Sequence, residues 1–131
     1  MNPTGHRLML QRYVTSTLTL LVLDVLWLYM FMIQRYEIMV KKIQGSHIKV
    51  RVWSAICAYA LMVLGLCIFV IPRVATYQDA FVYGGLFGLV TYGIFDFTCL
   101  SVFSDFDVKL AIIDILWGSF VYFMAALVSV Q

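Results

Sequence analysis

Three aspartates lie inside long apolar stretches of this 131-residue chain: Asp24, Asp96 and Asp114. Lipid is a poor solvent for a carboxylate, so an acid in such a stretch calls for a partner or a function. Three carboxylates in one low-dielectric site cannot all stay charged without a cation, because burial and like charges both favour the protonated form. No Lys, Arg or His falls at the same depth to neutralise them. Proton or cation movement across a membrane is the chemistry that these residues could support.

The alternative role for the three acids is structural. Protonated aspartates would form hydrogen bonds that hold helices in register, and the candidate supporting residues are Trp27, Thr91, Thr98 and Trp117. Such bonds contribute only about 0.6 kcal/mol each in membrane bundles. Because nothing in the sequence identifies a substrate, we favour the structural role and keep transport as the alternative.

Metal binding and enzyme chemistry have little support in the sequence. Asp96 and Cys99 share a helical face, but no histidine falls inside an apolar stretch, and a hard oxygen with a lone thiol is an uncommon ligand set. Nucleophile-elbow, phosphate-loop, zinc-protease and dithiol motifs are all missing from the sequence. We therefore expect no metal, no cofactor and no enzymatic activity.

Composition identifies an integral membrane protein. The chain is 63% apolar and 12% charged, whereas soluble domains are about 45–50% apolar and about 25% charged. A soluble domain this small could not hide that much apolar surface. The length suits a single membrane domain over residues 1–131, and a net charge of +2 is too small to indicate nucleic acid as a partner.

Hydropathy predicts an all-α, four-helix membrane bundle. The apolar stretches cover about residues 14–33, 53–71, 80–103 and 108–128, each long enough to cross a hydrocarbon core of about 30 Å. Residues 1–12 are expected to form a short polar tail. The lipid bilayer is therefore the first expected partner.

The segment between the first two spans, residues 34–51, is basic and amphipathic. Apolar residues recur there at helical spacing, and Arg35, Lys41 and Lys42 lie elsewhere around the helix, while Lys49 and Arg51 follow farther along the segment. We expect a short interfacial helix ended by Gly45 and Ser46, with anionic lipid headgroups against its basic face.

Small residues mark the third and fourth spans. Gly84 and Gly88 form a G-x-x-x-G pair, Gly93 follows in the same span, and Gly118 lies in the fourth. Such glycines let helix backbones approach closely in lipid. We expect them to serve packing within the bundle rather than dimerisation.

Charge asymmetry predicts the orientation. With four spans, the 34–51 and 104–109 loops share one side and carry most of the cations, whereas the other side has Arg7, Arg12 and Arg73. The positive-inside rule then places both loops in the cytoplasm, or in the matrix of a mitochondrion, with the termini opposite. At about 1.5 Å per residue, the three aspartates then lie roughly 9 to 14 Å below the inner surface, which predicts one polar cluster.

A short pattern occurs twice. Residues 23–28 read Leu-Asp-Val-Leu-Trp-Leu, and residues 113–118 read Ile-Asp-Ile-Leu-Trp-Gly. The two spans run in opposite directions, so an inverted repeat of the kind found in transporters is one interpretation. We favour a repeated local packing solution, because two short matches in apolar sequence are weak evidence of duplication.

The chain resembles domain-of-unknown-function family 2177 in four segments. They are residues 23–28, 85–92 (Gly-Leu-Phe-Gly-Leu-Val-Thr-Tyr), 95–98 (Phe-Asp-Phe-Thr) and 113–118. Its members are small four-span predicted membrane proteins of bacteria and of some large DNA viruses. The resemblance implies the four-span fold and supplies no activity. Where the family pattern has an asparagine shortly after the third-span aspartate, this chain has Cys99.

Two functions are compatible with these observations. We expect a structural or accessory component of a larger membrane assembly, such as a virion membrane or a multi-subunit complex, with other membrane subunits or its own copies as partners. The alternative is a small proton- or cation-coupled transporter or channel that uses the intramembrane aspartates.

Overall fold

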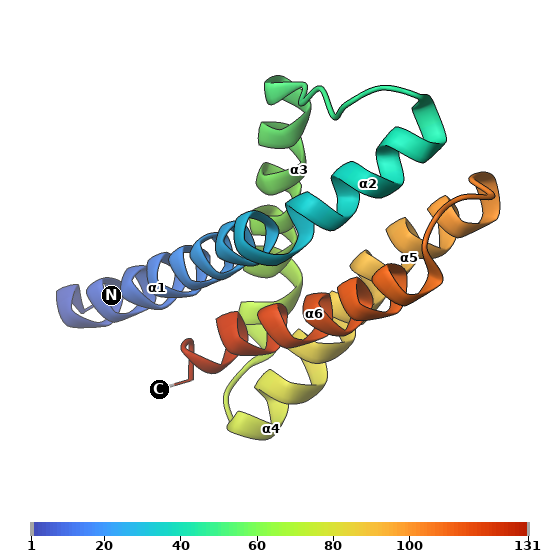
Figure 1. Cartoon of the computed structure of the whole chain (residues 1–131). Coiled ribbons are helices and arrows are strands. Elements are labelled where there is room, and N and C mark those ends of the chain that lie inside the picture. Colours follow the sequence, from blue (N-terminus) through green and yellow to red (C-terminus); the bar gives the residue numbers. More distant parts are fainter. Residues whose placement is uncertain (1, 131) are drawn as a thin grey trace.

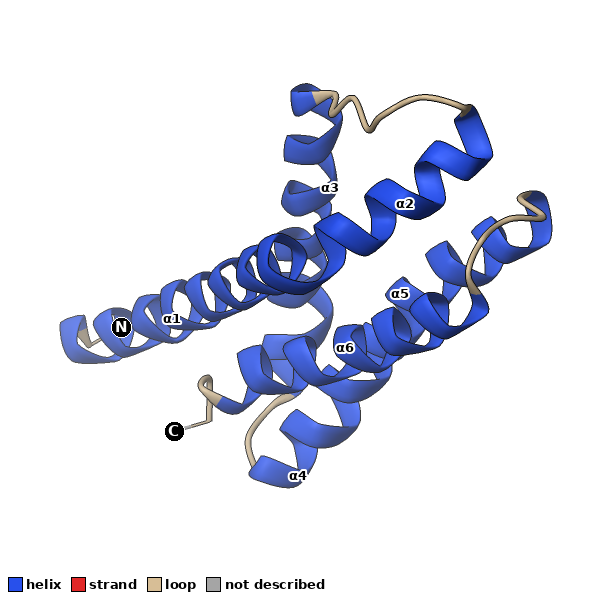
Figure 2. Ribbon diagram, viewed as in Figure 1, coloured by secondary structure: helices blue, strands red, loops and turns tan. Residues whose placement is uncertain are grey.

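The computed structural model describes residues 2–130, and every regular element in that range is a helix or a helical turn (Figure 1, Figure 2). In chain order the elements are α1 (Pro3–Trp27), the π-helical turn η1 (Leu28–Met32), α2 (Ile33–Gln44), α3 (Val52–Gly65), the π-helical turn η2 (Leu66–Val70), the 3-10 turn η3 (Ile71–Arg73), α4 (Tyr77–Asp79), the π-helical turn η4 (Ala80–Gly84), α5 (Gly85–Val102) and α6 (Val108–Leu127). Consecutive elements join into four helices long and apolar enough to cross a membrane: Pro3–Gln44, Val52–Arg73, Tyr77–Val102 and Val108–Leu127. The predicted all-α, four-span fold is confirmed.

The first helix begins much earlier than the sequence suggested. Residues 3–12 are helical, so the expected polar tail is wrong over that range. The Asn2 side chain accepts a hydrogen bond from the Thr4 amide at 3.3 Å, and Pro3 occupies the first turn, where its fixed φ suits a helix. With 42 residues at about 1.5 Å each, the helix from Pro3 to Gln44 is roughly twice as long as a bilayer core is thick.

The amphipathic segment is a continuation of the first helix. α2 follows α1 through η1 without a loop, and it ends at Gly45, whose φ of 73° is left-handed. Its apolar face packs on the turn between α5 and α6, where Met39 contacts Phe106 and Leu110 in a buried cluster. Lys41 and Lys42 remain exposed on the opposite face. The helix that we expected in the interface therefore packs against protein along its apolar side.

α5 and α6 form the most closely packed pair (Figure 1). A Cβ added at Gly88 would overlap the carbonyl oxygen of Gly118, and one added at Gly84 would lie 2.7 Å from the carbonyl oxygen of Tyr122. The two backbones can approach this closely only because the side chains are missing. Buried residues from α1, η2 and α6 continue this core, among them Leu20, Leu66 and Val121.

α3 is attached at one end only. Its first half stands away from the other helices in Figure 1, and Trp53 and Ile56 are 68% and 63% exposed there. In its continuation, Leu66, Val70 and Ile71 are buried, and Arg12 of α1 donates hydrogen bonds to the carbonyl oxygens of Ile71 (3.0 Å) and Val74 (2.5 Å). The second span is thus packed against the bundle at its C-terminal end, whereas open space lies beside its N-terminal end.

Candidate functional site

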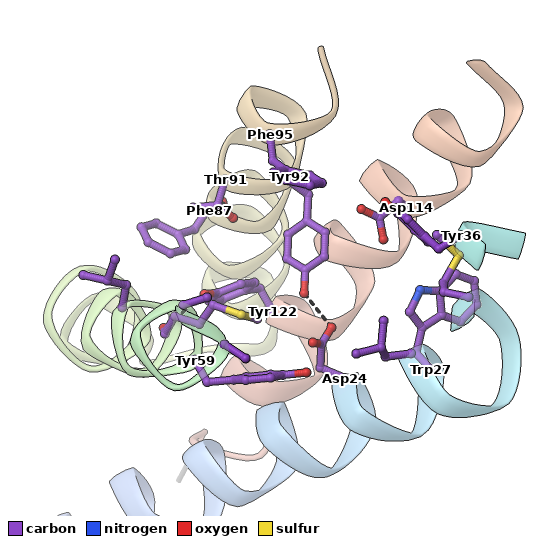
Figure 3. Close-up of a pocket in the computed structure, with 16 residues that line it drawn as sticks. Asp24, Trp27, Tyr36, Tyr59, Phe87, Thr91, Tyr92, Phe95, Asp114 and Tyr122 are labelled. Carbon is purple, nitrogen blue, oxygen red and sulfur yellow. Dashed lines mark hydrogen bonds between the residues drawn. The ribbon is translucent and has the colours of Figure 1, made fainter. Parts of the chain in front are cut away.

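A cavity of about 530 Å³ occupies the space between α1, α3, α5 and α6 (Figure 3). This volume lies within the range of small-molecule sites. Two carboxylates, Asp24 and Asp114, belong to its wall, and none of the described residues that line it is Lys, Arg or His. Most of the remaining wall is apolar or aromatic, with rings from Trp27, Tyr59, Phe87, Tyr92, Phe95 and Tyr122.

Asp24 connects three helices. Its Oδ1 accepts a hydrogen bond from the Tyr92 hydroxyl of α5 at 2.6 Å and another from Trp117 Nε1 of α6 at 3.0 Å. The side chain of Asp24 is only 9% exposed, and the Tyr59 hydroxyl of α3 is turned toward it in Figure 3. Donors from several helices converge on one carboxylate, which is the arrangement that accommodates a negative charge away from water.

Asp96 and Asp114 form a second acidic group beside the first. Asp96 is 0% exposed, and neither of its carboxyl oxygens has a hydrogen-bond donor in the described part of the chain. Asp114, 8% exposed, lies beside Asp96 and also lines the cavity. Like charges that are buried this close together repel each other, which favours a proton on one of the two carboxyls.

The repeated Asp-x-x-Trp pattern explains part of this geometry. Residues at i and i+3 share a helix face, and α1 and α6 run in opposite directions, so each aspartate lies near the tryptophan of the other helix. Trp27 and Trp117 stack between them, with ring centroids 4.5 Å apart and planes 5° from parallel. Only one of the two indole N–H groups is bonded: Trp117 donates to Asp24, whereas Trp27 Nε1 is buried without an acceptor.

The three predicted aspartates therefore lie close together in the structure, but only two of the four predicted supporting residues belong to the site. Trp27 and Trp117 belong to the site. Thr91 lies in the cavity wall but donates to the Phe87 carbonyl oxygen of its own helix at 2.9 Å, and Thr98 is exposed on the outer side of α5. Neither threonine bonds to an aspartate.

Three of the four predicted glycines make close contacts. Gly84 and Gly88 face α6, and a Cβ at Gly118 would overlap the ring of Tyr92. Gly118 thus leaves the space through which Tyr92 crosses α6 to reach Asp24. Gly93 is different, because a Cβ there would meet no atom within 4 Å.

Sequence reasoning missed the tyrosines as site residues. Tyr92 supplies the shorter of the two bonds to Asp24, and Tyr122, also in the cavity wall, donates to the Met62 carbonyl oxygen of the second span at 3.0 Å. One available signal was the spacing of Tyr92 and Asp96, which puts a hydroxyl one helical turn from a buried acid.

The comparisons with known proteins agree with this architecture. Residues 9–131 match a protein family described as "Predicted membrane protein (DUF2177)". Neither the curated proteins nor the solved structures gave a match. The matched range contains the three aspartates, both tryptophans of the site and nearly all of the four candidate spans. The chain therefore belongs to the DUF2177 family and is a membrane protein with four candidate spans.

Proposed function

We propose that this protein is a small membrane carrier in which proton binding by the Asp96–Asp114 pair is coupled to occupation of the adjoining cavity. One observation supports this most directly: Asp114 belongs both to the cavity wall and to the buried carboxyl pair. A group in that position responds to a proton on one side and to a solute on the other. The two ligands then compete for the same negative charge, which is the basis of coupled exchange.

The loosely held half of α3 provides the movement that a carrier needs. Tyr59 and Leu61 of this helix form one wall of the cavity, while the opposite wall comes from the closely packed α5 and α6. Carriers expose a central site to alternate sides by moving one helix or bundle against another. In this chain, movement of the first half of α3 would change access to the aspartates without breaking the Gly88–Gly118 contact.

Proton flux in proteoliposomes tests the carrier function. Wild-type protein, with a pH-sensitive dye inside the vesicles, should dissipate an imposed pH gradient faster than empty vesicles. Asp96→Asn and Asp114→Asn should each abolish that flux, because the amide cannot release a proton. Asp105→Asn is the matched control, since Asp105 lies exposed in the turn before α6. Flux that survives in both buried-site variants would contradict the proposal.

A second candidate function is an accessory role in a larger membrane assembly. It is favoured by the length of the first helix, whose N-terminal turns extend past the expected span and expose Met9 and Leu10. An apolar surface outside the bilayer core calls for a protein neighbour. Purification in mild detergent should then recover a stoichiometric partner, whereas a partner-free protein that carries protons would rule against this role.

We also propose the orientation that the cations suggest, with the 34–51 and 104–109 loops on the cytoplasmic or matrix side. Lys41 and Lys42 are exposed on α2, and we expect them to meet anionic headgroups there. A cysteine at the exposed position 46 (Ser46→Cys), in a chain whose three native cysteines are replaced by serine, should be protected from an impermeant maleimide in intact cells. Labelling from outside would reverse the assignment.

A further inference from the structure

We infer that the cavity takes an organic cation with an aromatic or otherwise apolar body, whose charge is held between Asp24 and Asp114. This inference rests on the proposed carrier function and names the class of its substrate. It follows from three features of the site, which are its charge, the nature of its walls and the place where it opens.

The charge of the site favours a positive ligand. Both hydrogen bonds to Asp24 end on Oδ1, and the Tyr59 hydroxyl is turned toward the same carboxylate, so a cation in the cavity would compete with that hydroxyl. Asp114 is more than nine-tenths buried and also lines the cavity. Because no basic residue lines the cavity, the balancing charge has to come from a proton or from the bound molecule.

The walls favour an organic cation over a metal ion. Hard cations such as Mg²⁺ and Ca²⁺ need six or more oxygen ligands, which two carboxylates among aromatic rings do not supply. Ring faces attract organic cations within about 6 Å, most strongly where water is excluded. Tyr59 and Tyr92 flank Asp24 in Figure 3, and Phe95 lies farther along the same wall. A planar cation can place its charge at the carboxylates and its body among these rings.

The cavity opens through the side of the bundle. Leu28 of η1, Leu61 of α3 and Phe95 of α5 line it and are also exposed on the outer surface of their helices. These residues lie within the apolar spans, so the opening faces the bilayer. An amphiphilic cation dissolved at the membrane surface can reach the aspartates by this route, whereas a strongly hydrated ion would have to lose its water in lipid.

Calorimetric binding to the purified protein in detergent tests the inference without requiring transport. The probe is N-methyl-4-phenylpyridinium, and 4-phenylpyridine, uncharged at neutral pH, is its neutral partner. The cation should bind, and Asp24→Asn should weaken it at least tenfold, about 1.4 kcal/mol. The neutral probe should bind more weakly and should be insensitive to Asp24→Asn. Equal binding of the two probes, or no binding of the cation, would overturn the inference.

Two further variants guard against a folding artefact. Phe95→Leu changes an exposed rim residue, so the protein should remain folded while cation binding weakens through the loss of one ring face. Asp105→Asn should leave binding unchanged. Cation binding without proton flux in vesicles would reject the carrier function and keep the ligand class, whereas flux without cation binding would reject the ligand class alone.

Discussion

The interface between α5 and α6 and the space beside the first half of α3 are opposite solutions to packing helices in lipid. At Gly88 and Gly118 two backbones touch, and no side chain separates them. Along the first half of α3 the helix leaves its neighbours, and a cavity of about 530 Å³ lies beside it in place of packed side chains. Dispersion contacts are the main attraction between helices in a bilayer, so we expect the first region to be rigid and the second to move more readily.

The aspartates lie where these two regions meet. Asp96 and Asp114 belong to the closely packed pair, and Asp24 is bonded to the same pair through Tyr92 and Trp117. The opposite wall is α3, and Arg12 holds the end of the same span by its hydrogen bonds to the carbonyl oxygens of Ile71 and Val74. The three aspartates are thus held by closely packed helices, and they face the loosely packed first half of α3 across the cavity.

The largest effect is expected for a methyl group at the helix contact. Gly88→Ala forces the backbones of α5 and α6 apart, because the new Cβ would overlap the Gly118 carbonyl; overpacking of this kind costs about 1–3 kcal/mol. Gly93→Ala, in the same helix, meets nothing within 4 Å and should be neutral or slightly stabilising. Thermal unfolding in detergent, followed by tryptophan fluorescence, measures both. Equal midpoints for the two variants would show that the contact is not close.

A smaller contrast is expected within the second span itself. Amide hydrogen exchange in detergent, read by mass spectrometry, should be faster over residues 52–65 than over residues 66–73, because Leu66, Val70 and Ile71 are buried in the core whereas most of residues 52–65 are exposed. α5 should be at least as protected as the slower segment. Uniform protection along the whole span would contradict the proposal that the first half of α3 moves relative to the other helices.

The smallest effect concerns the loop that restrains the free end of α3. The His47 ring and the Ile48 amide both bond to the partly exposed Glu37 side chain of α2, beyond the apolar stretch, and this lowers the pKa of Glu37. A lowered carboxyl pKa means that the restraint is complete above the ordinary glutamate value and is lost as pH falls through the folded value. The Ile48 amide resonance should therefore show a transition in acid, below the ordinary pKa of a glutamate. Glu37→Gln should abolish that transition, and an unchanged transition in this variant would assign it to another group.

The fold was largely predictable because apolar length is a strong signal in a membrane protein. The four spans and the end of α2 at Gly45 follow from composition and from one glycine. The helical start at Pro3 was not predictable from hydropathy, since the residues around Arg7 and Arg12 are too polar to read as a span. Three π-helical turns also escaped prediction, because they arise where tertiary contacts compete with the regular helical bonds.

The site was predictable in its acids and less so in their partners. The depth of a residue in the membrane can be counted from the end of its span, and this count predicted the same depth for Asp24, Asp96 and Asp114. The direction in which Tyr92 points depends on how α5 is rotated against α6 and on the space left at Gly118. Helix rotation is set by packing, and a single sequence with similar apolarity on all faces does not specify it.

Infrared spectroscopy of the carboxyl groups tests the central claim most directly, since that claim is a proton held between Asp96 and Asp114. At neutral pH the wild-type protein should show the C=O stretching band of a protonated carboxylic acid. Asp96→Asn and Asp114→Asn should each change or remove this band, and Asp105→Asn should leave it intact. A wild-type protein without such a band, or a band that survives unaltered in both variants, would contradict the shared proton and the carrier function built on it.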